Sequence, residues 1–171
     1  GRGGAEQRRN SPGNRWEIAV SLPRMDIELA RKWAMLLTMG VEAGGVLFWV
    51  RQLGLLPGAP GEPRVAGSGQ SGKVLNVSGL TGSYVGQFSQ FFTVITGERR
   101  YGYKLAAAVR ADGAGTASFA IEPALRAEPA DGDVLEIGKP YVQGLLADLP
   151  EEVSNVSYLA EGFGFTIREA R

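Results

Sequence analysis

Apolar and polar residues alternate in residues 16–22 and 163–168, which is the pattern of strands with one buried face. In residues 16–22 every second position is apolar, and Pro23 ends the stretch because proline cannot donate to a β-ladder. The run 46–50 is apolar throughout, which predicts a central strand. Strands are expected at 16–22, 46–50, 74–77, 91–96, 103–109, 117–121, 134–137 and 162–168.

One stretch repeats its apolar residues at helical spacing instead. Asp26 stands at the N-cap position, Glu28 falls in the first turn, where the helix dipole favours an acid, and Gly40 suits the C-terminal cap. We therefore expect one helix at about residues 26–39, with its apolar stripe in the core rather than in a ligand groove. The stripe consists of Leu29, Trp33, Leu36 and Leu37.

Glycine and proline divide the chain into further segments. Residues 1–14 are polar and rich in Gly and Arg, which predicts a flexible N-terminal arm. Residues 53–63 hold repeated Gly and Pro, which predicts a long loop with Leu55 and Leu56 at an apolar tip. The expected fold is mainly β: a single domain over 15–171, built as a β-barrel or β-sandwich of roughly eight strands with one amphipathic helix.

Composition removes several classes of site. The chain has no Cys and no His, so thiolate nucleophiles, Ser-His-Asp triads and Cys/His zinc sites are excluded. We expect no enzyme activity, no cofactor and no metal. Lys and Arg number 18 and Asp and Glu number 18, so no broad basic field favours nucleic acid. No apolar run approaches the roughly 18 residues of a membrane span, so no membrane insertion is expected.

Residues 67–73, Gly-Ser-Gly-Gln-Ser-Gly-Lys, match the short patterns of two nucleotide-binding loops. Both loops need a helix directly afterwards, because the N-terminus of that helix binds phosphate. A strand-like stretch follows instead, and Val74 stands where a P-loop has Ser or Thr. We therefore expect a turn between two strands and no nucleotide.

Two groups of carboxylates and one basic pair remain as candidates. Asp131, Asp133 and Glu136 straddle an expected turn, and Asp148, Glu151 and Glu152 lie near Pro150, so both groups are expected to serve solubility and local backbone hydrogen bonds. Arg99 and Arg100 stand at an expected hairpin tip, where a solvated role is commoner than nucleic-acid contact.

Several segments, taken in order, resemble a group of tail proteins from long-tailed bacteriophages. The most specific is Val-Arg-Ala-Asp-Gly-Ala-Gly-Thr-Ala at 109–117, followed by Ile-Glu-Pro-Ala-Leu-Arg at 121–126. The segment 86–104 departs from the phage pattern, which carries a Gly-Asp turn before a Tyr-Leu strand. The other matching segments are 15–25, 44–49, 65–72 and 162–169.

This resemblance implies a structural virion protein near the tail tip, similar to distal tail or baseplate proteins, assembled in the host cytoplasm. Such proteins form rings around the tail axis, so the implied partners are further copies of the chain, for example six, together with the tail tube and the tip hub. A closed ring needs two different contact patches on each subunit. Candidate assembly contacts are Arg2, Arg8, Arg9, Leu55, Leu56, Arg99 and Arg100.

Two other classes of function compete with this interpretation. One is a carbohydrate or host-surface recognition module at the tail tip, in which exposed aromatic rings stack on sugars. The other is a carboxylate-dependent hydrolase of the cell wall. Aromatic candidates for the first class are Trp49, Tyr84, Tyr101, Tyr103 and Tyr141.

Overall fold

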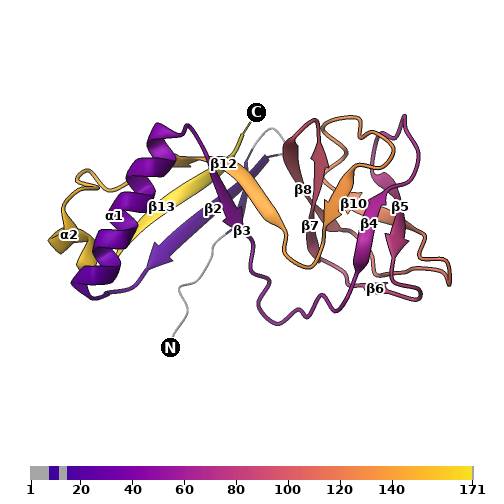
Figure 1. Cartoon of the computed structure of the whole chain (residues 1–171), viewed down its shortest axis with the longest axis horizontal. Coiled ribbons are helices and arrows are strands. Elements are labelled where there is room, and N and C mark those ends of the chain that lie inside the picture. Colours follow the sequence, from indigo (N-terminus) through magenta and orange to yellow (C-terminus); the bar gives the residue numbers. More distant parts are fainter. Residues whose placement is uncertain (1–7, 12–14, 171) are drawn as a thin grey trace. The chain divides into compact units, whose positions relative to one another are not determined.

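The computed structural model describes residues 8–11 and 15–170 of the 171-residue chain. These residues are mainly β, as predicted, and hold thirteen strands and two helices (Figure 1). The strands are β1 (Arg8–Ser11), β2 (Arg15–Leu22), β3 (Val46–Trp49), β4 (Gly61–Val65), β5 (Val74–Leu80), β6 (Val85–Gly86), β7 (Phe91–Thr96), β8 (Arg99–Leu105), β9 (Val109–Arg110), β10 (Ala117–Glu122), β11 (Val134–Glu136), β12 (Tyr141–Ala147) and β13 (Phe163–Glu169). The helices are α1 (Ile27–Glu42) and α2 (Val156–Ala160).

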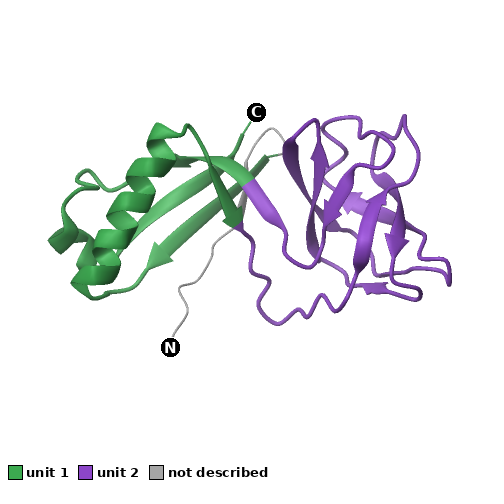
Figure 2. Cartoon of the chain, in the orientation of Figure 1, with its two compact units in different colours: residues 1–48, 143–171 green, residues 49–142 purple. Residues whose placement is uncertain are grey.

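The chain divides into two compact units where the sequence predicts one domain (Figure 2). Unit 1 comprises the described parts of 1–48 and 143–171, and unit 2 comprises 49–142. Unit 2 is one continuous segment inserted between β3 and β12, which are neighbouring strands of one sheet. The apolar pattern continues across both boundaries without a linker, so the sequence carries no sign of the division.

Unit 1 is built on an antiparallel sheet with the strand order β1-β2-β13-β12-β3. The register of β2 and β13 sets Ile18 opposite Ile167 and Val20 opposite Phe165, so their apolar side chains share one face. Trp33 of α1 lies 6.0 Å from the ring of Phe165 and therefore packs the helix on this face. The period-2 pattern predicted for residues 16–22 is confirmed in β2.

Helix α1 begins where the sequence predicts and ends later. The Asp26 side chain accepts a hydrogen bond from the backbone N–H of Leu29 at 2.8 Å, which confirms the N-cap. The helix continues to Glu42, so the prediction that Gly40 caps it is wrong. Gly40 is instead buried inside the last turn, where a Cβ would lie 2.7 Å from Val46 Cγ1.

Two further expectations for unit 1 are corrected. Leu29 and Leu36 belong to the stripe that the sequence assigns to the core, but they are 44% and 57% exposed. The stretch 46–50 is not a central strand, because β3 comes last in the order of its sheet. Burial in β3 alternates, and Leu47 is 53% exposed. This alternation arises because successive side chains of a strand point to opposite faces of the sheet.

Unit 2 is a closed barrel with the strand order β10-β5-β4-β11-β7-β8, in which β8 pairs with β10. Closure leaves no unpaired edge within the ring of strands. The inward side chains form one apolar core, in which the rings of Phe92 and Phe119 meet edge to face at 5.5 Å. The strands β6 and β9 form a separate two-stranded ladder.

Candidate functional site

The Gly/Pro loop predicted at 53–63 is present between β3 and β4 and belongs to unit 2, but it ends earlier than predicted, because residues 61–63 are part of β4. Its backbone is held against the barrel at several points. The Tyr84 hydroxyl donates to the Pro57 carbonyl at 2.8 Å, and the Thr81 hydroxyl donates to the Ala59 carbonyl at 2.8 Å. Burial raises the pKa of Tyr84, while its hydrogen bond with Gln90 acts in the opposite direction.

The leucines of this loop differ in exposure. Leu56 is 86% exposed, in keeping with its predicted place at the tip, whereas Leu55 is half-buried and lines a pocket. Leu53, which was not among the predicted contacts, is 88% exposed and borders the same pocket. The sequence pattern that identified Leu55 and Leu56, an apolar residue among Gly and Pro, also applies to Leu53. We call these two exposed side chains, Leu53 and Leu56, the loop tip.

Two of the predicted basic contacts, Arg99 and Arg100, interact with side chains of unit 2. Arg100 donates from Nε and Nη2 to the carboxylate of Glu136 at 3.1 and 3.0 Å, with both side chains largely buried. This bidentate ion pair uses the Arg100 charge inside unit 2, so Arg100 is not an exposed contact for another subunit. Arg99 follows the Gly97-Glu98 turn and lies 5.5 Å over the ring of Tyr101.

The predicted contacts in the N-terminal arm are described only in part. Arg8 and Arg9 fall in β1, where they pair with Ile18 and Glu17 of β2. This part of the predicted flexible arm is therefore a strand of the sheet in unit 1. Arg2 lies outside the described residues, as do the rest of 1–7 and 12–14.

An open apolar groove of about 210 Å³ lies on unit 1, between α1 and the sheet. Apolar side chains line it throughout, and Leu36 and Leu47 on its rim are both more than half exposed. The sequence predicts core packing here, and the groove was not anticipated. We call it the α1 groove; its lining residues are Trp33, Leu36, Leu37, Val46, Leu47, Phe48, Leu146, Phe165 and Ile167.

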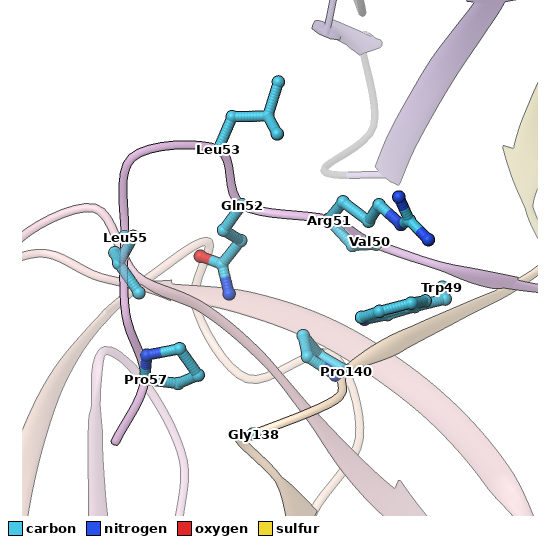
Figure 3. Close-up of a pocket in the computed structure, with 9 residues that line it drawn as sticks. All are labelled: Trp49, Val50, Arg51, Gln52, Leu53, Leu55, Pro57, Gly138 and Pro140. Atoms are coloured by element: carbon cyan, nitrogen blue, oxygen red, sulfur yellow. The ribbon is translucent and has the colours of Figure 1, made fainter. Parts of the chain in front are cut away.

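A second pocket, of about 360 Å³, lies on unit 2 beneath the Gly/Pro loop. Figure 3 shows Trp49 and Arg51 on one side of it, Leu55 and Pro57 on the other, and Gln52 between them. The Arg51 guanidinium lies 4.6 Å over the Trp49 ring, and the Lys139 ammonium lies 4.8 Å from the centre of the same ring. Trp49, which lies close to two cations, thus borders a pocket with an apolar opposite wall.

The aromatic residues proposed for sugar stacking differ in their solvent exposure. Tyr103 and Tyr84 are buried in the barrel core, so neither offers a face to a ligand. Tyr101 and Tyr141 are half-buried, and Trp49 is 38% exposed but already lies against two cations.

The nucleotide-like pattern at 67–73 forms a loop between β4 and β5, as predicted, and no helix follows it. Its own side chains occupy the polar positions of the loop. The Gln70 side chain donates to the carbonyl of Gly67 at 2.9 Å and accepts from the N–H of Asn76, and Asp131 accepts from the N–H of Gly67 at 2.7 Å. The backbone N–H groups of Gly67 and Asn76 are thus engaged within the unit.

Members of the two predicted carboxylate groups pair with residues elsewhere in their units. Glu136 was expected to serve solubility or a local backbone hydrogen bond, but it is largely buried in the ion pair with Arg100. Asp133 accepts from the hydroxyl of Thr96 and from the N–H of Ala130 at 2.8 and 2.9 Å, and Asp148 pairs with Arg168 at 3.1 Å. Within residues 8–11 and 15–170, no three acidic side chains converge in a way that could hold a metal ion. Among the described helices, none combines the length and apolar character needed to cross a membrane.

Comparison with known proteins adds no family to this description. No protein-family model matches the chain, and no curated protein sequence matches it.

Proposed function

We propose that the chain is a structural protein of a bacteriophage tail, a distal tail or baseplate component whose copies assemble into a ring around the tail axis. Its partners are then further copies of itself, the tail tube and the tip hub, and its place is the virion. Several segments between residues 15 and 169, taken in their order along the chain, resemble phage tail proteins, and this resemblance supports the proposal.

The observation that carries the proposal is the presence of two dissimilar apolar patches. A head-to-tail ring needs one patch for each neighbour, whereas a two-fold dimer uses one patch twice. The loop tip on unit 2 presents Leu53 and Leu56 at 88% and 86% exposure. The α1 groove on unit 1 is concave and apolar. We infer that the loop tip of one copy enters the α1 groove of the next.

This contact is tested by substituting each patch and measuring the mass of the assembly by sedimentation equilibrium. The double variant Leu53→Ser/Leu56→Ser removes the loop tip, and Leu36→Glu places a charge on the rim of the groove. Burying an unpaired charge in an apolar contact is strongly unfavourable. We expect the wild-type chain to sediment as a multiple of 18.2 kDa and both variants to shift toward 18.2 kDa.

Two controls carry comparable changes outside the patches. Phe88→Ser removes a side chain that is 70% exposed, and Met39→Glu charges another exposed position of α1 that does not line the groove. Both controls should assemble like the wild type. Equal dissociation of controls and test variants would show that the two patches are not the specific contact, and a wild-type monomer at all concentrations would contradict ring assembly by the chain alone.

A further inference from the structure

The pocket beneath the Gly/Pro loop is bordered by an exposed leucine of that same loop. Its volume is about 360 Å³, and its apolar walls include Val50, Leu55, Pro57 and Pro140. Leu53 also borders the pocket, yet this residue is 88% exposed. Figure 3 shows the Leu53 side chain turned away from Leu55 and Pro57. An apolar side chain thus lies in water beside an apolar cavity of the same unit.

The loop is anchored to the barrel at both ends of the short span 53–56. Before the span, the Gln52 side chain donates to the carbonyl of Phe91 at 2.9 Å and accepts from the N–H of the same residue. After the span, the Tyr84 hydroxyl donates to the Pro57 carbonyl at 2.8 Å. These two anchors confine any change of conformation to the four residues between them.

A glycine inside the span permits such a change. Gly54 has a φ of +78°, and a Cβ added there would meet nothing within 4 Å. Glycine adopts positive and negative φ about equally readily, so this position allows more than one backbone conformation. Rotation at Gly54 and at Leu53 can redirect the Leu53 side chain while both anchors stay in place.

We propose that the span 53–56 has two conformations, an open one with Leu53 in solvent and a closed one with the Leu53 side chain inside the pocket. Closure transfers this side chain from water onto Val50, Leu55 and Pro57, which is favourable. The pocket has room for it, because an apolar cavity of about 150 Å³ already holds a benzene molecule.

This loop switch controls the proposed assembly, and that part of the inference rests on the proposed function. Closure withdraws Leu53 from the loop tip and leaves Leu56 alone to enter the α1 groove of the next copy. The apparent affinity between copies then falls with the fraction of subunits that are open. A loop locked in the closed form loses the burial of one leucine, which should weaken assembly about tenfold or more.

The closed form is tested first in a full-length chain that does not assemble. Leu36→Glu charges the rim of the α1 groove and changes no residue of unit 2. In this variant we expect nuclear Overhauser effects from the Leu53 methyl groups to protons of Leu55 and Pro57. The methyl groups of Leu56, which does not line the pocket, are the control and should show none to Pro57 across the pocket. A Leu53 side chain without these effects would overturn the proposal.

The control of assembly is tested with a disulfide, since the chain has no cysteine of its own. Leu53→Cys/Gly138→Cys places two thiols on the pocket lining, and a Cβ on Gly138 is in ordinary contact with Pro60 at 3.8 Å. Oxidation should lock the span closed and lower the mass found by sedimentation equilibrium, and reduction should restore it. Leu53→Ser/Gly138→Ser cannot form a disulfide and should not respond to the oxidant. Failure of the two cysteines to pair within one chain would overturn the proposal.

The outcomes distinguish this inference from the proposed function. An oxidised Leu53→Cys/Gly138→Cys chain that assembles as tightly as the reduced one would overturn the control of assembly by the loop, while the ring itself would stand. A wild-type chain that stays monomeric would contradict the ring and with it the control of assembly. The closed form is decided in either case by the effects measured at Leu53 in the Leu36→Glu variant.

Discussion

At the scale of single residues, the turn between β9 and β10 shows how few atoms fix a local structure. The Asp112 carboxylate accepts from the N–H groups of Ala114 and Thr116 at 2.9 and 2.8 Å and from the Thr116 hydroxyl at 2.6 Å. Gly115 has a φ of +79°, which glycine adopts without strain. The hairpin-type sequence at 112–115 thus gives the turn that its residue types predict, although the structure pairs β9 with β6.

The two glycines of this turn should respond differently to alanine. A Cβ on Gly115 would lie 2.0 Å from the carbonyl oxygen of Leu80, in addition to the strain of the positive φ. We expect Gly115→Ala to lower the free energy of unfolding by about 1–3 kcal/mol. A Cβ on Gly113 meets nothing within 4 Å, so Gly113→Ala should be neutral or slightly stabilising. Urea unfolding measures both, and equal effects would contradict the steric argument.

Acid should destabilise this turn, because the turn is stabilised by the ionised carboxylate of Asp112. The hydrogen bond from the Thr116 hydroxyl, together with backbone N–H groups, lowers the pKa of Asp112 below its ordinary value of 3.8. Because the folded state has the lower pKa, the contribution to stability is present above pH 3.8 and is lost as pH falls through the folded pKa. Asp112→Asn should lower the melting temperature at pH 7. Between pH 5 and pH 2 the melting temperature of this variant should fall by less than that of the wild type.

The matched control for this acid series is Glu128→Gln. It removes the same charge from an exposed side chain for which no hydrogen bond is present among the described residues. Its loss of melting temperature on acidification should equal that of the wild type. A parallel acid response of Asp112→Asn and Glu128→Gln would contradict a specific role for the turn.

At the scale of elements, the Gly/Pro loop is the segment whose position matters most to the proposed assembly. It has no regular hydrogen-bonded ladder, so its position depends on side chains of the barrel. Gln52 pairs with the backbone of Phe91, and Tyr84 holds Pro57. Leu53 and Leu56 remain largely exposed, and Leu53 and Leu55 both line the pocket.

Removing one anchor should loosen this loop. Tyr84→Phe deletes the donor to the Pro57 carbonyl and leaves the buried Gln90 amide without its hydroxyl acceptor. We expect a loss of about 1–3 kcal/mol in the free energy of unfolding and faster hydrogen exchange at residues 53–58. Tyr158→Phe is the control, since Tyr158 is 55% exposed on α2. Unchanged exchange at 53–58 would show that Tyr84 does not hold the loop.

At the scale of the whole molecule, the division into two units is the feature that the sequence did not reveal. Alternation along the chain predicts strands such as β2 and β10, because it depends only on which face is buried. Strand order depends on pairing between distant residues, so the edge position of β3 could not be read from its apolar run. The same holds for Arg100, whose partner Glu136 is 36 positions away.

The candidate surfaces were predictable to a similar degree. Gly and Pro identified the loop and its leucines, but the choice between Leu53 and Leu55 as the exposed residue depends on anchors in the barrel. The exposure of Leu36 depends on how far α1 covers the sheet. The contact of Lys139 with Trp49 could not be predicted, because a single lysine beside a proline is a common sequence and the two residues meet only in the folded chain.

Unit 2 should fold when separated from the rest of the chain. It is one continuous segment, 49–142, with a closed barrel and its own apolar core. A fragment of these residues should unfold in one cooperative transition and give dispersed 1H–15N spectra. A fragment without cooperative unfolding would show that the barrel depends on unit 1 and would restore the single domain predicted from the sequence.

The central claim, that copies of this chain close into a ring through two different patches, is tested most directly by electron microscopy of the purified chain. The account predicts class averages with rotational symmetry of order three or higher and a central opening, and their loss in the Leu53→Ser/Leu56→Ser variant. Two-fold dimers, open filaments or isolated 18.2 kDa particles at every concentration would contradict it.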